Sequence, residues 1–262
     1  MQRAFAAILA SPWADAPRER FAECVAQSDP ERAQFIRRQL AVAVQRRRAG
    51  VRKKPIESDA MLAGLPGLKH GVRWSGPVAP LLGFDGTNGA PWRFRRGFVE
   101  QVTIATPHFL KIAGSLYGRA PILDLVLTDA RPHIRALFSS PHLARIRSID
   151  LSNNKLGDAE IEVLSKSAQL SRLRWLSLYF NAVSDRGVEY LAAAKERLPA
   201  LRFVRLDSNP CGDPNPYFDE EDGRTYELVR SAVGDELVEK HGPLAWIGDN
   251  PSTFAPDPET FE

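Results

Sequence analysis

One spaced pattern of apolar residues and asparagine occurs three times in the second half of the chain. Apolar residues hold its first, fourth, sixth and eleventh positions, and asparagine holds its ninth; the copies span residues 146–156, 173–183 and 201–211. The central apolar residues, Ile149, Leu176 and Val204, lie 27 and 28 residues apart. A unit that repeats at such a period cannot bury its apolar face alone, so neighbouring units must stack into an array with a broad surface.

Each copy predicts one strand followed by one helix. Apolar and polar residues alternate in the first half of the pattern, as in a strand with one buried face. Residues 158–168 and 185–198 carry apolar residues at helical spacing, with Asp158 and Ser184 or Asp185 as candidate N-caps. One strand and one helix in a period of this length is typical of leucine-rich repeats and resembles the ribonuclease-inhibitor subclass. We therefore predict an α/β fold: a leucine-rich-repeat solenoid with parallel strands on the concave face, helices outside, and a small N-terminal helical domain.

The recurrent asparagines, Asn154, Asn181 and Asn209, follow each predicted strand. A side-chain amide both donates and accepts hydrogen bonds, so it can pair backbone groups where the chain turns out of the strand. We interpret the three residues as a structural ladder and not as a site. Two fainter copies, at residues 99–104 and 122–127, share the strand half of the pattern without the asparagine, which brings the expected array to about five coils.

The remaining sequence predicts five segments along the chain. The sequence Ser28-Asp-Pro-Glu31 is a capping-box signature that begins a long helix. The acidic, Pro-rich end of the chain predicts an extended tail. The expected segments are an N-terminal helical domain (1–50), an irregular connecting segment (51–96), the repeats (97–212), a C-terminal cap (213–248) and a flexible tail (249–262), with a helix from Thr225 to His241 in the cap.

The charged residues are unevenly distributed. Residues 1–60 hold 12 Lys/Arg against 7 Asp/Glu, and residues 61–212 hold 20 against 12, whereas residues 213–262 hold 3 against 13. A basic body with an acidic tail fits self-masking, a charged partner or simple solubility, and all three remain open. No apolar run reaches the roughly 18 residues that a membrane span needs, and the two cysteines lack metal-type spacing, so we expect a cytoplasmic protein.

Two N-terminal stretches resemble a known bacterial module. Phe5-Ala-Ala-Ile-Leu-Ala-Ser-Pro with Asp15-Ala-Pro-Arg18, and Asp29-Pro-Glu-Arg-Ala-Gln-Phe-Ile-Arg-Arg-Gln-Leu40, resemble the repeat-companion domain that precedes leucine-rich repeats in proteins of myxobacteria and planctomycetes. Arg95-Arg-Gly-Phe-Val-Glu100 is similar to the join before the first repeat in that family. Residues 20–25 depart from the family's Tyr-Ala-Asp-Trp-Leu-like core. The resemblance implies an interaction module without enzymatic activity.

No motif in the chain predicts catalysis, a metal or a cofactor. The five histidines are scattered, and the Gly-rich stretch 83–89 lacks the Gly-Lys-Ser/Thr ending of a phosphate loop. The acidic run 219–222 lacks the alternating ligand spacing of a calcium loop. We therefore expect a non-catalytic protein that needs no cofactor.

Two surfaces remain as candidates for binding a partner. The first is the concave face, where strand alternation brings aromatic residues and an arginine together in the manner of a binding hot spot. Its candidate residues are Asp150, Trp175, Tyr179, Phe203, Arg205 and Asp207. We expect this face to bind a protein, with an enzyme encoded nearby as one option, and the chain by itself to be a monomer.

The second surface is a basic run at the end of the third helix. Its six cations could contact nucleic-acid phosphates: Arg46, Arg47, Arg48, Arg52, Lys53 and Lys54. No recognition helix or interleaved aromatic residue accompanies them, and a helix C-terminus favours cations in any case. Nucleic acid is therefore the alternative, less favoured partner.

Overall fold

The structure is a computed structural model that describes residues 1–49, 68–86, 89–211 and 232–247. The predicted phosphate-contacting residues Arg52, Lys53 and Lys54, and the predicted tail 249–262, lie outside the described residues. The described chain divides into two compact units. The first holds residues 1–104 and 112–125, and the second holds residues 105–111 and everything from residue 126 onward.

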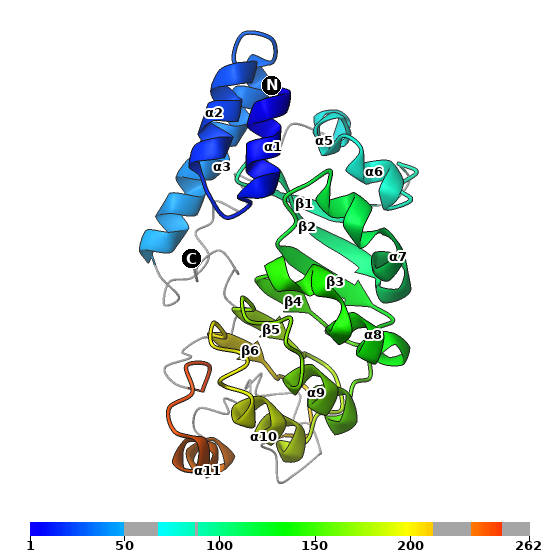
Figure 1. Cartoon of the computed structure of the whole chain (residues 1–262), viewed down its shortest axis with the longest axis vertical. Coiled ribbons are helices and arrows are strands. Elements are labelled where there is room, and N and C mark those ends of the chain that lie inside the picture. The colour runs from blue at the N-terminus through cyan, green and yellow to red at the C-terminus, as the bar shows by residue number, and fades with distance from the viewer. Residues whose placement is uncertain (50–67, 87–88, 212–231, 248–262) are drawn as a thin grey trace, which may run out of the picture. The chain divides into compact units, whose positions relative to one another are not determined.

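The chain has a mixed α/β fold with a six-stranded sheet, whose strands pair in chain order from β1 to β6 (Figure 1). The strands are β1 (Trp92–Arg95), β2 (Phe98–Ala105), β3 (Asp124–Thr128), β4 (Ser148–Asp150), β5 (Trp175–Ser177) and β6 (Phe203–Arg205). The α-helices are α1 (Gln2–Ala10), α2 (Ala16–Val25), α3 (Pro30–Ala49), α5 (Leu68–Ser75), α6 (Val78–Leu81), α7 (Thr106–Tyr117), α8 (Ile134–Ser139), α9 (Asp158–Ser165), α10 (Asp185–Ala193) and α11 (Ala232–His241). Short 3-10 helices span Arg131–His133 and Pro141–Arg145. None of the helices described here combines the length and the apolar character that crossing a bilayer requires.

Helices α1, α2 and α3 enclose the apolar core of the first unit together with one residue of β2. This cluster comprises Ile8, Ala22, Val25, Ala33, Ile36, Leu40 and Phe98. Helix α3 begins at Pro30, and the carboxylate that caps it belongs to Asp29, which accepts a hydrogen bond from the backbone N–H of Arg32 at 3.1 Å. The capping-box signature therefore placed the start of the helix correctly but named the wrong capping side chain, Ser28, whose hydroxyl donates to the Val25 carbonyl.

A buried ionic cluster connects the loop between α1 and α2 to the β1–β2 hairpin. The Glu100 carboxylate accepts hydrogen bonds from Arg18 Nη2 at 2.6 Å and from Arg96 Nη2 at 2.9 Å. All three side chains are fully buried, with 0% exposure. The two guanidiniums also donate to the Pro12 carbonyl, at 2.7 and 3.1 Å, and Arg96 Nη1 lies 3.3 Å from Asp15. Burial lowers the pKa of Arg18 to about 10, although the Glu100 charge acts in the opposite direction.

Gly97, at the turn of the same hairpin, lies directly against helix α3. Its φ of +85° is in the left-handed region, and a Cβ there would come within 2.5 Å of Ile36 Cγ1 and 2.8 Å of Ile36 Cα. Its N–H donates to Gln39 Oε1 at 2.7 Å. The turn therefore requires glycine twice, for its backbone conformation and for its contact with the helix.

For residues 51–96 we predicted irregular or short helical structure. Within residues 51–96, the structure describes α5, α6 and strand β1, which pairs antiparallel with β2 and carries a register shift between Arg93 and Phe94. The C-terminal helix α11 ends at His241, the predicted position, while residues 225–231 of the predicted helix lie outside the described residues.

In the second unit, β4, β5 and β6 are parallel and equally registered. Ile149 pairs with Leu176, which pairs with Val204, so the three central residues of the sequence pattern occupy one row of the sheet. Helices α9 and α10 follow β4 and β5 and lie on the same side of these strands (Figure 1). The Asp158 carboxylate, which the sequence suggested as a cap for its own helix, instead accepts hydrogen bonds from the Ser184 N–H at 2.9 Å and hydroxyl at 2.6 Å.

The three recurrent asparagines join each strand to the one before it. Asn154 Oδ1 accepts from the Ala130 N–H at 2.7 Å, and its Nδ2 donates to the Leu127 carbonyl at 2.8 Å. The same arrangement recurs in the other two copies. Asn181 accepts from the N–H groups of Asn154 and Leu156 and donates to the Leu151 carbonyl, and Asn209 accepts from the Val183 N–H and donates to the Leu178 carbonyl.

Candidate functional site

The candidate residues that we predicted to share one sheet face lie together in three rows that run across β4, β5 and β6. Strand pairing aligns Ser148 with Trp175 and Phe203 in the first row and Asp150 with Ser177 and Arg205 in the second. Backbone hydrogen bonds from Asn153 to Tyr179 and from Phe180 to Asp207 continue the pairing and place Ser152, Tyr179 and Asp207 in a third row. Neighbouring strands are separated by ~4.8 Å, so these side chains form one patch, which we call the outward rows.

The two large rings of the first row are buried. Trp175 and Phe203 stack with ring centroids 5.9 Å apart at 19°, and only 7% and 4% of their surfaces are exposed. Within the described residues, the Trp175 Nε1–H is buried without a hydrogen-bond acceptor. Strand alternation predicted the sheet face on which these rings lie, but it could not predict how much of their surface other residues bury. They therefore offer little surface to a partner.

The accessible part of the patch is built around Arg205. Its guanidinium carbon lies 4.2 Å from the centroid of the Tyr179 ring, and its Nε donates to Asp207 Oδ2 at 2.7 Å. The side chains of Arg205 and Asp207 are 32% and 22% exposed, and Tyr179 is half-buried. A planar guanidinium held by both a ring and a carboxylate has already lost much of its rotamer freedom, which lowers the entropic cost of binding.

The Asp150 side chain is held by a small hydroxyl network. Asp150 Oδ1 accepts from the Ser152 N–H at 2.9 Å and also from its hydroxyl. The Ser152 hydroxyl lies 2.9 Å from that of Ser177, which is fully buried. Asp150 is therefore oriented by its neighbours while it remains partly exposed.

A row of arginines directly precedes the strands. Arg147, Arg174 and Arg202 occupy the second position of each repeat copy, and the Arg174 and Arg202 N–H groups donate to the backbone carbonyls of Arg147 and Arg174. Burial lowers the pKa of Arg174, and the positive charges of Arg147 and Arg202 add to that effect. The recurrence of arginine at the second position of all three copies is the sequence feature that indicates this row, and it is not among the predicted site residues.

The basic run of α3 is only partly described. Arg47 forms an ion pair with Asp15 at 2.5 Å, so this cation is engaged within the chain. The side chains of Arg46 and Arg48, like residues 52–54, lie outside the described part. Among the described residues, no group of three or more His, Cys, Asp or Glu side chains is placed to hold a metal ion.

Comparisons of the chain with protein-family models, with curated proteins and with solved structures found no match.

Proposed function

We propose that residues 97–211 form leucine-rich-repeat coils and that the chain is a non-catalytic scaffold or recognition subunit, which binds a protein partner through the outward rows. The 27- and 28-residue spacing of the central apolar residues supports the repeat assignment, as do the parallel register of β4, β5 and β6 and the three asparagine bridges.

The observation that carries the binding proposal is the Arg205–Tyr179 pair with its Asp207 brace. Arginine and tyrosine are enriched among the residues that dominate protein interfaces. Here they are partly exposed and lie on the same face as the buried rings of Trp175 and Phe203. Preorganised polar groups beside buried aromatic rings resemble the core of a protein interface.

The partner contact is tested with a double variant, Tyr179→Ala with Arg205→Ala. The matched control is Arg186→Ala with Tyr190→Ala, because that pair on helix α10 has the same composition and a similar contact: the guanidinium lies 5.7 Å from the ring, and Arg186 Nε donates to Tyr190 Oη at 3.0 Å. Tagged wild type and both variants are used to capture proteins from a lysate of the source organism, and any protein lost only by the Tyr179/Arg205 variant is purified and titrated.

Removal of one hot-spot residue costs ~2 kcal/mol or more, which corresponds to a roughly 30-fold change in the dissociation constant. We expect the Tyr179/Arg205 variant to weaken binding of the purified partner at least 30-fold and the Arg186/Tyr190 variant to leave it within about threefold. Equal losses in the two variants, or none in either, would contradict the assignment of the outward rows.

A further inference from the structure

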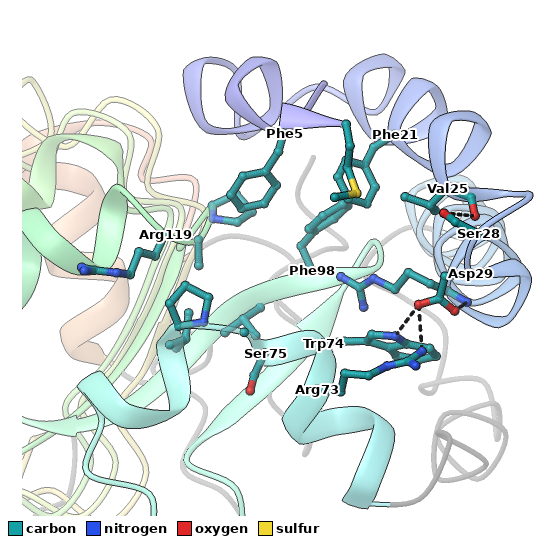
Figure 2. A pocket seen from close by; sticks show the side chains of 18 residues that line it. Phe5, Phe21, Val25, Ser28, Asp29, Arg73, Trp74, Ser75, Phe98 and Arg119 are labelled. Atoms are coloured by element: carbon teal, nitrogen blue, oxygen red, sulfur yellow. Dashed lines mark hydrogen bonds and ion pairs between the residues drawn. The ribbon is translucent and has the colours of Figure 1, made fainter. Parts of the chain in front are cut away.

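A cavity in the first unit contains a buried arginine that forms no ion pair within the described residues. The cavity has a volume of about 350 Å³, within the range of small-molecule sites. Its walls come from α1, α2, the start of α3, α5, β2 and the segment at residues 119–121 (Figure 2). Arg32, on the first turn of α3, lines it and is only 6% exposed.

The Arg32 guanidinium is surrounded by aromatic faces. Its central carbon lies 5.0 Å from the ring centroid of Trp74 and 5.1 Å from that of Phe98, with Phe94 and Phe35 at 5.6 and 5.8 Å. These rings attract the cation through their π-electron faces, but they accept no charge-assisted hydrogen bond of the kind that a carboxylate offers. The ring contacts therefore fix the position of the guanidinium without neutralising it.

The Asp29 carboxylate, whose charge acts on Arg32, accepts its hydrogen bonds from groups other than the Arg32 guanidinium. Asp29 Oδ2 accepts from Arg73 Nη2 at 2.8 Å and from Trp74 Nε1 at 3.2 Å, as Figure 2 shows, and Asp29 Oδ1 accepts from the Arg32 backbone N–H. Within the described residues, Arg32 Nη1 is buried and has no hydrogen-bond acceptor. A buried charge without such a partner is costly unless something else supplies one.

Other buried arginines of the same unit are treated differently. Arg18 and Arg96 share the Glu100 carboxylate and several backbone carbonyls. Burial lowers the pKa of Arg32 to about 9, with Asp29 opposing and Arg73 reinforcing that shift, so at neutral pH the group keeps its proton and its charge. The cavity thus presents a cation with one N–H-bearing nitrogen, Nη1, that lacks an acceptor within the described residues.

Aromatic rings extend along the cavity from Phe98, which also contacts Arg32. Phe5, Phe21 and Phe98 form a three-ring cluster with centroid separations of 6.1, 6.1 and 5.2 Å (Figure 2). Two further cations, Arg73 and Arg119, line the cavity with exposed side chains. A molecule that fills this space meets both aromatic rings and positively charged side chains.

We propose that this cavity binds a small organic anion, with an apolar body against the rings of Phe5, Phe21 and Phe98 and a single carboxylate or phosphate group that pairs with Arg32. The inference goes beyond the proposed partner-binding function and does not depend on it, because all of the cavity's residues belong to the first unit.

The test uses isothermal titration calorimetry of the full chain with three probes of one shape: naphthalene-1-acetate, its neutral amide and 1-naphthyl phosphate. At least one anion should bind with a dissociation constant of about 1 mM or lower, which ligand efficiency allows for a molecule of this size. That anion should bind at least tenfold more tightly than the neutral amide. The two anions distinguish a carboxylate ligand from a phosphate ligand. The Trp74 indole N–H resonance, assigned with Trp74→Phe, should shift on titration because that ring lines the cavity.

Arg32→Gln should weaken binding of the anion at least tenfold, whereas the matched control Arg38→Gln, an exposed position on the same helix, should leave it unchanged. Should Arg32→Gln fail to fold, Ser28→Trp serves instead: Ser28 is an exposed residue of the cavity's lining, and a large ring there should block binding while leaving the core intact. Equal affinity for acid and amide, unchanged binding in either cavity variant, or no binding of either anion overturns the proposal.

Discussion

Glu100 is expected to be among the most important single residues for the stability of the first unit. Its carboxylate compensates two guanidiniums, from Arg18 and Arg96, and all three side chains have 0% exposure. At ~4 Å between charge centres and an effective dielectric constant near 20, each pair is attracted by about 4 kcal/mol. The desolvation of the ions offsets much of that attraction while the cluster is intact.

The change Glu100→Gln removes the charge but keeps the size of the side chain. Both arginines then remain buried. Among the described residues, Asp15, whose side chain is 26% exposed, still forms an ion pair with Arg96. Removal of one partner from a buried ion pair costs about 3–5 kcal/mol, because the remaining charge is uncompensated. We expect a loss of that size in the free energy of unfolding, a large part of the 5–15 kcal/mol typical of a folded domain.

Equilibrium unfolding in urea, followed by circular dichroism, measures this loss. Glu23→Gln, at an exposed position on helix α2, is the matched control and should change stability by less than about 0.5 kcal/mol. A loss below about 1 kcal/mol in Glu100→Gln would refute the reasoning, since it would mean that the two guanidiniums find compensation without the carboxylate.

Two further predictions concern the second unit and the thiols. Asn181→Ala leaves two backbone N–H groups of the preceding copy without their acceptor, so it should lower the free energy of unfolding in urea by about 2 kcal/mol. The control variant Gln169→Ala should change that free energy almost not at all. Similar losses in the two variants would contradict the role of the asparagine ladder. Burial raises the pKa of the Cys211 thiol to about 12, and the Asp185 charge adds to that effect. At pH 8 an aromatic disulfide reagent should therefore label only the exposed Cys24 in the native chain, and both cysteines in concentrated urea. Rapid labelling of two thiols without urea would show that Cys211 is accessible.

The local pattern of the sequence predicted the second unit well, because the relevant information is periodic. The three central residues of the repeat copies became the central residues of β4, β5 and β6. The fainter copies at residues 99–104 and 122–127 lie within or overlap β2 and β3. Alternation over a few residues is sufficient to fix which side chains share a face of a sheet.

Contacts between distant segments were not predictable in the same way. The Arg18–Glu100 pair joins residues 82 positions apart, and the Gly97 contact with α3 joins a turn to a helix in another part of the chain. Both lie within the stretches that resemble the repeat-companion domain, but nothing in the local spacing indicated that they meet. The cavity around Arg32 was missed for the same reason, since its walls come from segments with no common pattern.

The candidate patch shows where the limit of pattern-based prediction lies. Tyr179, Arg205 and Asp207 were assigned to a shared face from alternation alone, and they do contact one another. The burial of Trp175 and Phe203 depends on what packs over them, which alternation does not encode.

The asparagine bridges all connect a repeat copy to the copy that precedes it in the chain. Each amide reaches back toward the N-terminus: Asn181 serves backbone groups of the copy before it, and Asn209 serves those of the copy that contains Asn181. A ribosome releases the chain from its N-terminal end, so the backbone N–H groups of Asn154, Leu156 and Val183 emerge before the asparagines that accept their hydrogen bonds. In a nascent chain that stops short of residue 209, the Val183 N–H therefore lacks its asparagine acceptor.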